Sequence, residues 1–256
     1  MMSFEGPKFN TEPNKSEQEP LSGDFLKQQI RLPEAEWDER FRKLVTRKIK
    51  EKKDRESKEP EESPEVLREE SYRRYLKVLN LDEELLRGKK ILDFGSGEGE
   101  FVKYLIDKEI TQEAYGIDED LDQNTVEEEF QNHFFQGDFR DDLPVKDADY
   151  IVSVGAMNAV WTDEDVRDVK RMVDKTLASL KKNGEIRIAG IAEPAKANPI
   201  ELEGLDTTLK RWRELLKDIS ESQGIECRLE PQDIELMGED NHIALQYVLV
   251  IKRKEN

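Results

Sequence analysis

Apolar positions recur with a helical period in the first part of the chain. Over 34–58, apolar residues fall every three or four positions among strong helix formers, from Trp37 to Ile49, which predicts an amphipathic helix. Such a helix could pack on a domain, bind a partner or be a solvated tether, and the tether is the preferred interpretation. Ahead of it, residues 1–33 hold four prolines among polar residues, which predicts disorder.

From residue 63 onward, apolar runs of strand length alternate with amphipathic segments of helix length. Strands are predicted at "KKILDFG", "EAYGIDED", "HFFQGDF", "ADYIVSVGAM" and "KKNGEIRIAGI", with helical segments between them. Several runs are apolar on both faces, as in parallel strands covered by helices on both sides. The last two runs, "IECRLE" and "HIALQYVLVIK", leave no room for a helix between them and must pair as a hairpin.

The predicted fold class is therefore α/β: a Rossmann-like, mostly parallel seven-stranded sheet with helices on both faces and an antiparallel last strand. The change of pattern also predicts two parts. Residues 1–62 form a charged, largely disordered N-terminal extension with a possible helix at 34–58, and residues 63–256 form one domain. The boundary carries a helix-start sequence, Ser63-Pro64-Glu65.

The charge of the chain is uneven. Residues 1–64 carry 15 acidic and 14 basic side chains, so nearly all of the net charge of −18 belongs to the rest of the chain. Nucleic-acid affinity comes largely from phosphate neutralisation by Lys and Arg. A nucleic-acid partner is therefore not expected, although a local basic patch is compatible with these numbers.

Rare residue types limit the chemistry further. Cys227 is the only cysteine and there are two histidines, so no intrachain disulfide forms and no metal site is expected. No apolar run approaches the roughly 20 residues of a membrane span, and the N-terminus lacks the apolar segment of a secretory signal. The chain is expected to be cytoplasmic.

Three glycines at alternate positions separate the first predicted strand from its helix. Ligands of open α/β sheets bind beyond the carboxyl ends of the strands, where Gly95, Gly97 and Gly99 would let a backbone approach a ligand closely. The spacing is GxGxG rather than the GxGxxG of dinucleotide sites. Glu98 and Glu100 would repel a pyrophosphate, so the turn favours a cationic or zwitterionic ligand.

The segment "ILDFGSGEGEF" closely resembles the first motif of class I S-adenosylmethionine-dependent methyltransferases. Three more segments resemble later motifs of this family in order and spacing: "AYGIDED", "FFQGDFRDDLP" and "LASLKKNGEIRIAG". The resemblance covers about residues 65–253. It implies the fold predicted above and S-adenosylmethionine as the cofactor, with no metal requirement.

The resemblance also implies roles for individual residues. Asp93 and the turn formed by Gly95, Ser96, Gly97 and Gly99 would serve the amino acid end of the cofactor. Asp118, at the end of the second strand, would accept hydrogen bonds from the ribose hydroxyls. Asp138 would contact the adenine amino group, and Phe139 would lie by the adenine ring. Each residue also has a purely structural alternative as part of a turn, a solvated loop or the core.

The acceptor substrate should face the segment after the fourth strand, "SVGAMNAVWTDEDV". Asn158 and Trp161 are the candidates for substrate contacts, and structural roles for both remain open. The NPPY-type sequence of methyltransferases that act on nucleic-acid bases or protein glutamine is missing here. Two tyrosines on the preceding helix, Tyr72 and Tyr75, would either close over the cofactor or belong to the core.

These patterns predict a methyltransferase whose acceptor is a small molecule, with no membrane association and with a possible protein partner for the N-terminal extension. Two alternatives stay open. One is a non-catalytic binding or scaffold module with the same fold. The other is a methyltransferase acting on RNA or protein, with the N-terminal lysines and arginines as a docking arm.

Overall fold

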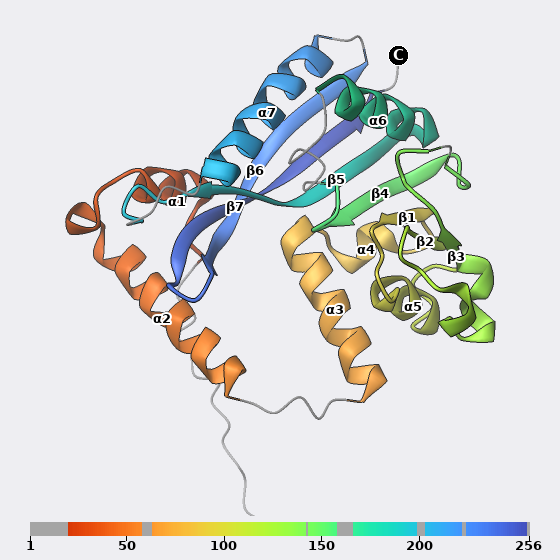
Figure 1. Ribbon diagram of the computed structural model, residues 1–256, viewed down its shortest axis with the longest axis horizontal. Coiled ribbons are helices and arrows are strands. Elements are labelled where there is room, and N and C mark those ends of the chain that lie inside the picture. Colours follow the sequence, from red (N-terminus) through yellow and green to blue (C-terminus); the bar gives the residue numbers. More distant parts are fainter. Residues whose placement is uncertain are drawn as a thin grey trace, which may run out of the picture.

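A single seven-stranded sheet organises the molecule (Figure 1). The computed structural model describes residues 20–57, 63–141, 143–157, 166–198, 203–221 and 224–254. The strand order is β3-β2-β1-β4-β5-β7-β6, and all neighbours are parallel except the pairs that involve β7. The predicted mostly parallel sheet with an antiparallel last strand is confirmed.

The strands are β1 (Ile91–Phe94), β2 (Ala114–Asp118), β3 (Phe134–Gln136), β4 (Ala148–Val154), β5 (Leu180–Pro194), β6 (Ile225–Met237) and β7 (His242–Arg253). The α-helices are α1 (Gly23–Ile30), α2 (Glu39–Glu56), α3 (Pro64–Leu79), α4 (Glu83–Leu86), α5 (Glu100–Asp107), α6 (Val166–Ser179) and α7 (Glu203–Ser220). The short segments η1 (Glu34–Glu36), η2 (Gln123–Thr125) and η3 (Glu128–His133) are 3₁₀ helices. Predicted strands and described strands agree in number and order.

Alternate residues of the strands supply two separate apolar cores, one on each face of the sheet. Leu92 and Ile151 belong to the core that contains α6 and α7, whereas their neighbours Ile91 and Val152 belong to the core that contains α3, α4 and α5. This division follows from the two-residue side-chain period of a strand. It explains why the central strands are apolar without interruption.

The N-terminal helices belong to the first of these cores. Leu26 and Ile30 of α1 and Phe41 of α2 are buried in the same cluster as α6 and α7, and α1 and α2 lie beside β6 (Figure 1). Residues 23–30 are thus helical rather than disordered, and α2 is a packed helix rather than a solvated tether. Burial of apolar side chains spaced by one helical turn stabilises this packing. The many polar residues between them make the overall composition of the segment polar, so composition alone does not indicate it.

Local sequence explains several element ends. The predicted helix start at Ser63 is confirmed, since its hydroxyl caps α3 and Pro64 is the first helical residue. Of the helical segments predicted between the strands, the one after β2 is instead formed by the two 3₁₀ helices η2 and η3. Among the described residues, no helix is long and apolar enough to cross a membrane.

Candidate functional site

The glycine turn between β1 and α5 is tight on both sides and open in the middle. Gly95, Gly97 and Gly99 have φ angles of 69°, 55° and 80°, a region in which other residues are strained. A Cβ on Gly95 would lie 2.1 Å from the Cβ of Ala156, and one on Gly99 would lie 2.2 Å from the ring of Phe134. A Cβ on Gly97 would meet no atom within 4 Å. The backbone at Gly97 is therefore accessible to a ligand.

The Asp93 carboxyl group lies fully buried at the end of β1, just before this turn. Neither of its oxygens has a hydrogen-bond partner among the described residues, and the same holds for the buried hydroxyl of Ser96. Burial raises the pKa of Asp93 well above its usual value, opposed by the nearby Tyr75 hydroxyl and reinforced by the charge of Asp118. An unpartnered buried carboxyl group is costly, so this one is suited to a ligand that carries a cation.

The two tyrosines of α3 have different surroundings. Tyr72 stacks on Tyr104 with ring centroids 4.3 Å apart and donates a hydrogen bond to Glu83 at 3.2 Å, which makes it a core residue. Tyr75 stacks on Phe101 at 4.3 Å, while its hydroxyl lies close enough to the Asp93 carboxyl group to affect its pKa. Tyr75 is therefore both a core residue and a wall of the candidate site.

The Asp118 carboxylate joins the end of β2 to the glycine turn. One of its oxygens accepts a hydrogen bond from the Gly97 amide at 2.8 Å, and the other accepts one from the Asp120 amide at 3.0 Å. A carboxylate has about four acceptor positions, so Asp118 can still accept hydrogen bonds from a ligand. The structure thus brings Asp93, the glycine turn and Asp118 together at one edge of the sheet.

Asp138 and Phe139 follow β3 at the same edge, since the amide of Gly137 donates to the backbone oxygen of Asp118 at 3.0 Å. Burial alone would raise the pKa of Asp138, but the Arg140 guanidinium at 2.6 Å lowers it overall. Phe139 stacks on Phe94 with ring centroids 5.2 Å apart. The Asp138 carboxylate is therefore engaged within its own loop, which the resemblance alone did not predict.

A second contact missed from the sequence is made by Ser153 in β4. Its buried hydroxyl donates to the backbone oxygen of Phe94 at 3.0 Å and accepts from the amide of Met157 at 2.9 Å. These bonds hold the residues that follow β4 against the end of β1, which is why Ala156 lies so close to Gly95. The only indication in the sequence was a polar residue inside an apolar strand.

The predicted substrate residues Asn158 and Trp161 lie outside the described residues. The described part of the chain holds no cluster of His, Cys, Asp and Glu side chains fit for a metal ion. A cavity of about 570 Å³ does occur, but it lies among α1, α2, α3 and β6 rather than at the glycine turn.

No protein-family model matches the chain, and no curated protein sequence matches it. Solved structures do match in shape at low sequence identity. Phosphoethanolamine N-methyltransferase 2 of Haemonchus contortus is 11% identical, with a TM-score of 0.48 over 73% of this chain and 53% of that protein. Magnesium protoporphyrin IX methyltransferase of Synechocystis is 15% identical, with a TM-score of 0.41 over 74% of this chain and 79% of that protein. This chain spans about half the length of the Haemonchus protein.

The chain has the sheet that the methyltransferase resemblance implies. The strand order of the chain and the antiparallel direction of β7 show this fold. The solved methyltransferases that it matches have sequence identities to this chain between 10% and 17%. The fold is therefore established, and the residues at the carboxyl ends of β1, β2 and β3 have to carry any argument about function.

Proposed function

We propose that the protein is an S-adenosylmethionine-dependent methyltransferase that acts on a small-molecule acceptor. The observation that carries the proposal is the Asp93 carboxyl group, which is fully buried next to a glycine turn with an accessible backbone and has only the Tyr75 hydroxyl close enough to stabilise its charge. The amino acid end of S-adenosylmethionine is a zwitterion, and its ammonium group would supply the cationic partner that this carboxyl group lacks. The residues present therefore fit the cofactor.

In this proposal, the chain holds and orients the cofactor. Asp93, the Ser96 hydroxyl and the glycine turn bind the amino acid end, and Asp118 accepts hydrogen bonds from the ribose. The bound cofactor supplies a methyl group activated by its sulfonium. Alignment of acceptor, methyl group and sulfur accounts for much of the rate enhancement of such a displacement, so Asn158 and Trp161 would serve by positioning the acceptor.

The adenine end of the proposed site needs a rearrangement. Asp138 can contact an adenine amino group only with the acceptor positions that Arg140 leaves free, because Arg140 bonds to both of its oxygens. Phe139 would offer the adenine ring the face that does not stack on Phe94. The Arg140 ion pair is also the one observation that favours the second candidate function, a binding module with the same fold and no catalysis.

Calorimetric titration with S-adenosylmethionine and with S-adenosylhomocysteine tests the proposal. We expect micromolar binding that weakens at least about tenfold in Asp93→Asn and in Asp118→Ala, the loss of one charge-assisted contact each. The matched control is Asp174→Ala on α6, whose carboxylate pairs with Lys170 on the surface. Failure of the unmodified protein to bind either compound would overturn the proposal.

Turnover then separates the enzyme from the binding module. Protein that binds the cofactor is incubated with methyl-labelled S-adenosylmethionine and a panel of small amines, alcohols and carboxylic acids. Label transferred to any member supports the methyltransferase. Binding of the cofactor without transfer to small molecules, RNA or protein supports the module.

A further inference from the structure

Two cavities are lined by successive residues of α2 and β6, and together they are called the α2–β6 groove. The first has a volume of about 570 Å³ and is lined by four basic residues, Arg40, Lys43 and Arg47 of α2 and Lys77 of α3. The second has a volume of about 470 Å³ and is lined by three, Lys48, Lys52 and Arg55 of α2.

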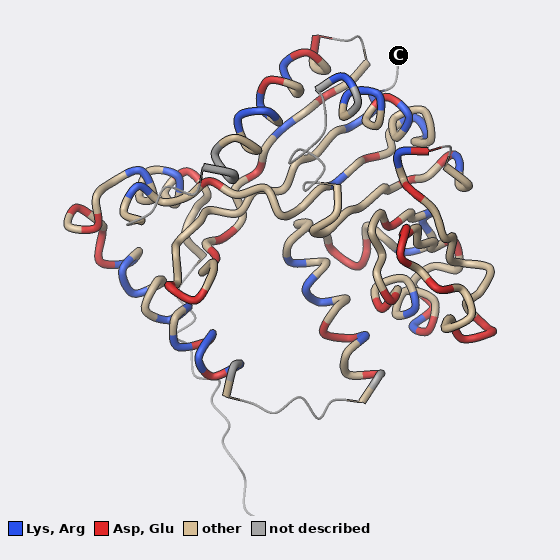
Figure 2. The backbone as a smooth tube through the Cα atoms, viewed as in Figure 1, with Lys and Arg blue, Asp and Glu red and all other residues tan. Residues whose placement is uncertain are grey.

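The charge of the groove is opposite to that of the chain. Seven basic residues line it against two carboxylates, Asp233 and Glu235, in a chain of net charge −18. Helix α2 alone holds nine basic and four acidic residues. Figure 2 shows Lys and Arg recurring along α2, and Asp and Glu gathered around β2 and β3. Because charges beyond about 8 Å are screened at physiological salt, the local charge decides what binds here.

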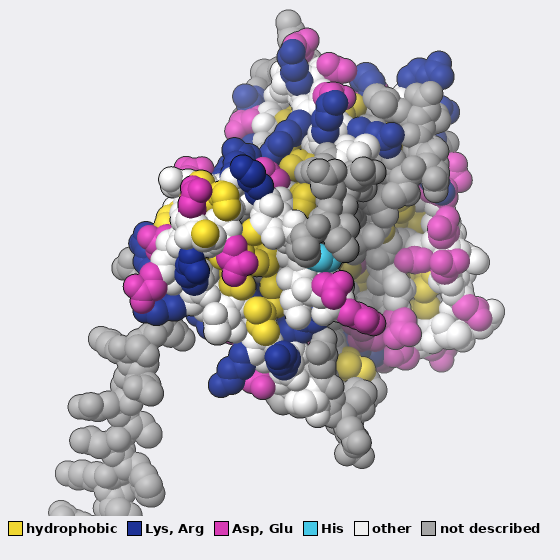
Figure 3. Space-filling model, turned by 60° about the vertical axis from the view of Figure 1, so that its left-hand side comes forward, with side chains coloured by type: hydrophobic (Ala, Val, Ile, Leu, Met, Phe, Trp, Pro, Cys, Tyr) yellow, Lys and Arg dark blue, Asp and Glu magenta, His cyan; other side chains and the backbone are white. Residues whose placement is uncertain are grey.

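The groove has an apolar floor beneath its basic rim. Leu21, Leu26 and Leu44 line the first cavity, and Ile234 and Leu236 line the second. Figure 3 shows apolar side chains at the surface of the molecule, with Lys, Arg, Asp and Glu side chains around them. A ligand that fits must therefore combine apolar surface with negative charge.

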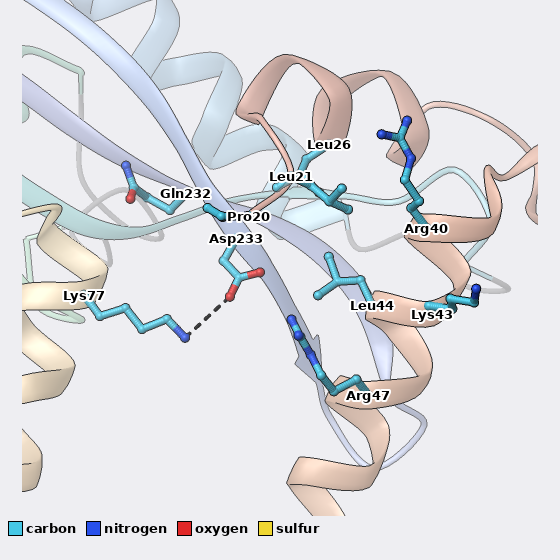
Figure 4. Close-up of a pocket in the computed structure, with 10 residues that line it drawn as sticks. All are labelled: Pro20, Leu21, Leu26, Arg40, Lys43, Leu44, Arg47, Lys77, Gln232 and Asp233. Atoms are coloured by element: carbon cyan, nitrogen blue, oxygen red, sulfur yellow. Dashed lines mark ion pairs between the residues drawn. The ribbon is translucent and has the colours of Figure 1, made fainter. Parts of the chain in front are cut away.

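Two basic side chains enter the first cavity from opposite sides. Arg47 projects into it from α2, and Lys77 reaches across from α3 to Asp233, 3.5 Å away (Figure 4). The nearest carboxylate paired with Arg47 is that of Glu51, at 3.6 Å. Both are long ion pairs of exposed side chains, which contribute little. These two cations are available to a stronger anion.

The basic residues form a line rather than a point. From Arg40 to Arg55 is 15 residues of helix, about 22 Å at 1.5 Å per residue. Single-stranded nucleic acid is usually bound by a positively charged groove that follows its backbone, together with side chains, most often aromatic, that contact the bases; here the apolar floor is aliphatic. We propose that the α2–β6 groove binds a single-stranded nucleic acid, with phosphates on the basic rim and bases against the apolar floor.

An acidic peptide fits the groove less well. Any anion that binds here competes with the carboxylates of Glu39 and Glu51, which lie 2.7 Å from Lys43 and 3.6 Å from Arg47, and a peptide carboxylate would only replace like with like. A phosphodiester strand instead brings a regular row of charges joined to flat apolar bases. Its binding also releases condensed counterions, a gain that grows with the number of phosphates neutralised.

Fluorescence anisotropy with a labelled 20-nucleotide single-stranded RNA tests the proposal on the full chain without cofactor. Single-stranded DNA of the same length and a polyglutamate peptide of equal charge serve as parallel probes. The groove variant Arg47→Glu with Arg55→Glu changes one cation in each cavity. The matched control, Lys50→Glu with Lys53→Glu, makes the same charge change on exposed residues of the same helix that line neither cavity.

We expect the dissociation constant for RNA to rise about tenfold or more in the groove variant and less than about threefold in the control. The slope of log affinity against log salt should fall by about one to two in the groove variant alone. Similar binding of DNA keeps the proposal, with the phosphodiester strand as the common ligand. Equal losses in both variants, polyglutamate binding as tight as that of RNA, or no RNA binding at all would each overturn it.

This inference does not depend on the proposed methyltransferase activity, because the groove shares no residue with the glycine turn. Asp93→Asn, which should weaken cofactor binding at least about tenfold, should bind RNA like the unmodified protein. Failure of one proposal is thereby distinguished from failure of the other.

Discussion

At the scale of single residues, Asp93 shows how a site can be recognised without a ligand. Its carboxyl group is fully buried, and among the described residues only the Tyr75 hydroxyl lies close enough to stabilise it, although nearly all buried polar groups in proteins are fully hydrogen-bonded. A chain that only needed a strand-to-helix turn would be more stable with an apolar residue here. The expense in stability is therefore consistent with a role in binding.

The first prediction concerns pH. Because burial raises the pKa of Asp93 in the folded state, the folded protein binds this proton more tightly than the unfolded chain does. Stability from this group therefore falls as pH rises from about 4, the pKa of an unperturbed Asp, through the folded pKa. Asp93→Asn should lose less stability between pH 5 and pH 8 than the unmodified protein, when urea unfolding is measured without ligand.

At pH 8 the variant should also be more stable outright, by about 1–3 kcal/mol, since it no longer buries a carboxyl group without a cationic partner. Asp174→Asn is the control, because its carboxylate lies on the surface and its loss should leave the pH dependence as it was. A pH dependence identical in all three proteins would show that Asp93 is solvated or paired in solution.

The second prediction compares two glycines of the same turn. Gly95→Ala adds a Cβ that meets Ala156 at 2.1 Å at a φ of 69°, so backbone strain and overpacking together should cost about 2–4 kcal/mol of unfolding free energy. Gly97→Ala has a similar φ but open space, so strain alone should cost about 1–2 kcal/mol. Urea unfolding measures both costs.

Calorimetry completes the comparison, because the accessible backbone at Gly97 is the proposed contact with the cofactor. Gly97→Ala should therefore weaken S-adenosylmethionine binding despite its smaller effect on stability. Equal stability losses in the two variants would contradict the described packing around Gly95.

The sequence predicted that the glycine turn and Asp118 lie at the carboxyl ends of β1 and β2, where the structure has them, because glycine spacing and strand ends are local patterns. Their roles in binding stay predictions. The sequence did not reveal that Arg140 would bond to Asp138, because a side-chain ion pair has no periodicity and depends on rotamers. Nor did it reveal that Ser153 would link β4 to β1, since that bond joins residues 59 positions apart. The sequence thus predicted which polar groups lie at the site, but it did not predict which other groups of the protein bond to them.

At the scale of elements, the N-terminal helices are the main departure from the sequence prediction. The apolar positions of α2 were identified correctly, but the surface that they cover, beside β6, is built from residues almost two hundred positions later. Local periodicity predicts that a helix has an apolar face and says nothing about its partner. The many charged residues around these apolar positions then favoured a solvated tether over a packed helix for α2.

The third prediction follows from this packing. Phe41 of α2 is fully buried in the core that also contains α6 and α7, so Phe41→Ala should lower the unfolding free energy by about 3–5 kcal/mol. Thr46→Ala, on the exposed side of the same helix, should change it by less than about 0.5 kcal/mol. Both should unfold in one transition by circular dichroism. A change in unfolding free energy below about 0.5 kcal/mol for Phe41→Ala would contradict the packing of α2 and support the tether interpretation.

At the scale of the whole molecule, charge is distributed unevenly, so stability and the proposed nucleic-acid binding should respond oppositely to salt. The excess of acidic residues outside the N-terminal segment repels itself, whereas the α2–β6 groove concentrates basic residues. A single net charge of −18 therefore describes neither region. The same number explains why nucleic acid was not expected from composition.

The fourth prediction uses this contrast. Raising sodium chloride from 10 to 300 mM should increase the unfolding temperature by several degrees, because screening relieves the repulsion among acidic side chains. The same change should weaken RNA binding by at least about tenfold, because phosphate contacts lose their counterion-release advantage. Potassium glutamate at equal ionic strength is the control that separates screening from chloride binding. A fall of both the unfolding temperature and the RNA affinity with salt would contradict this prediction. It would mean that ion pairs stabilise the acidic surface more than repulsion destabilises it.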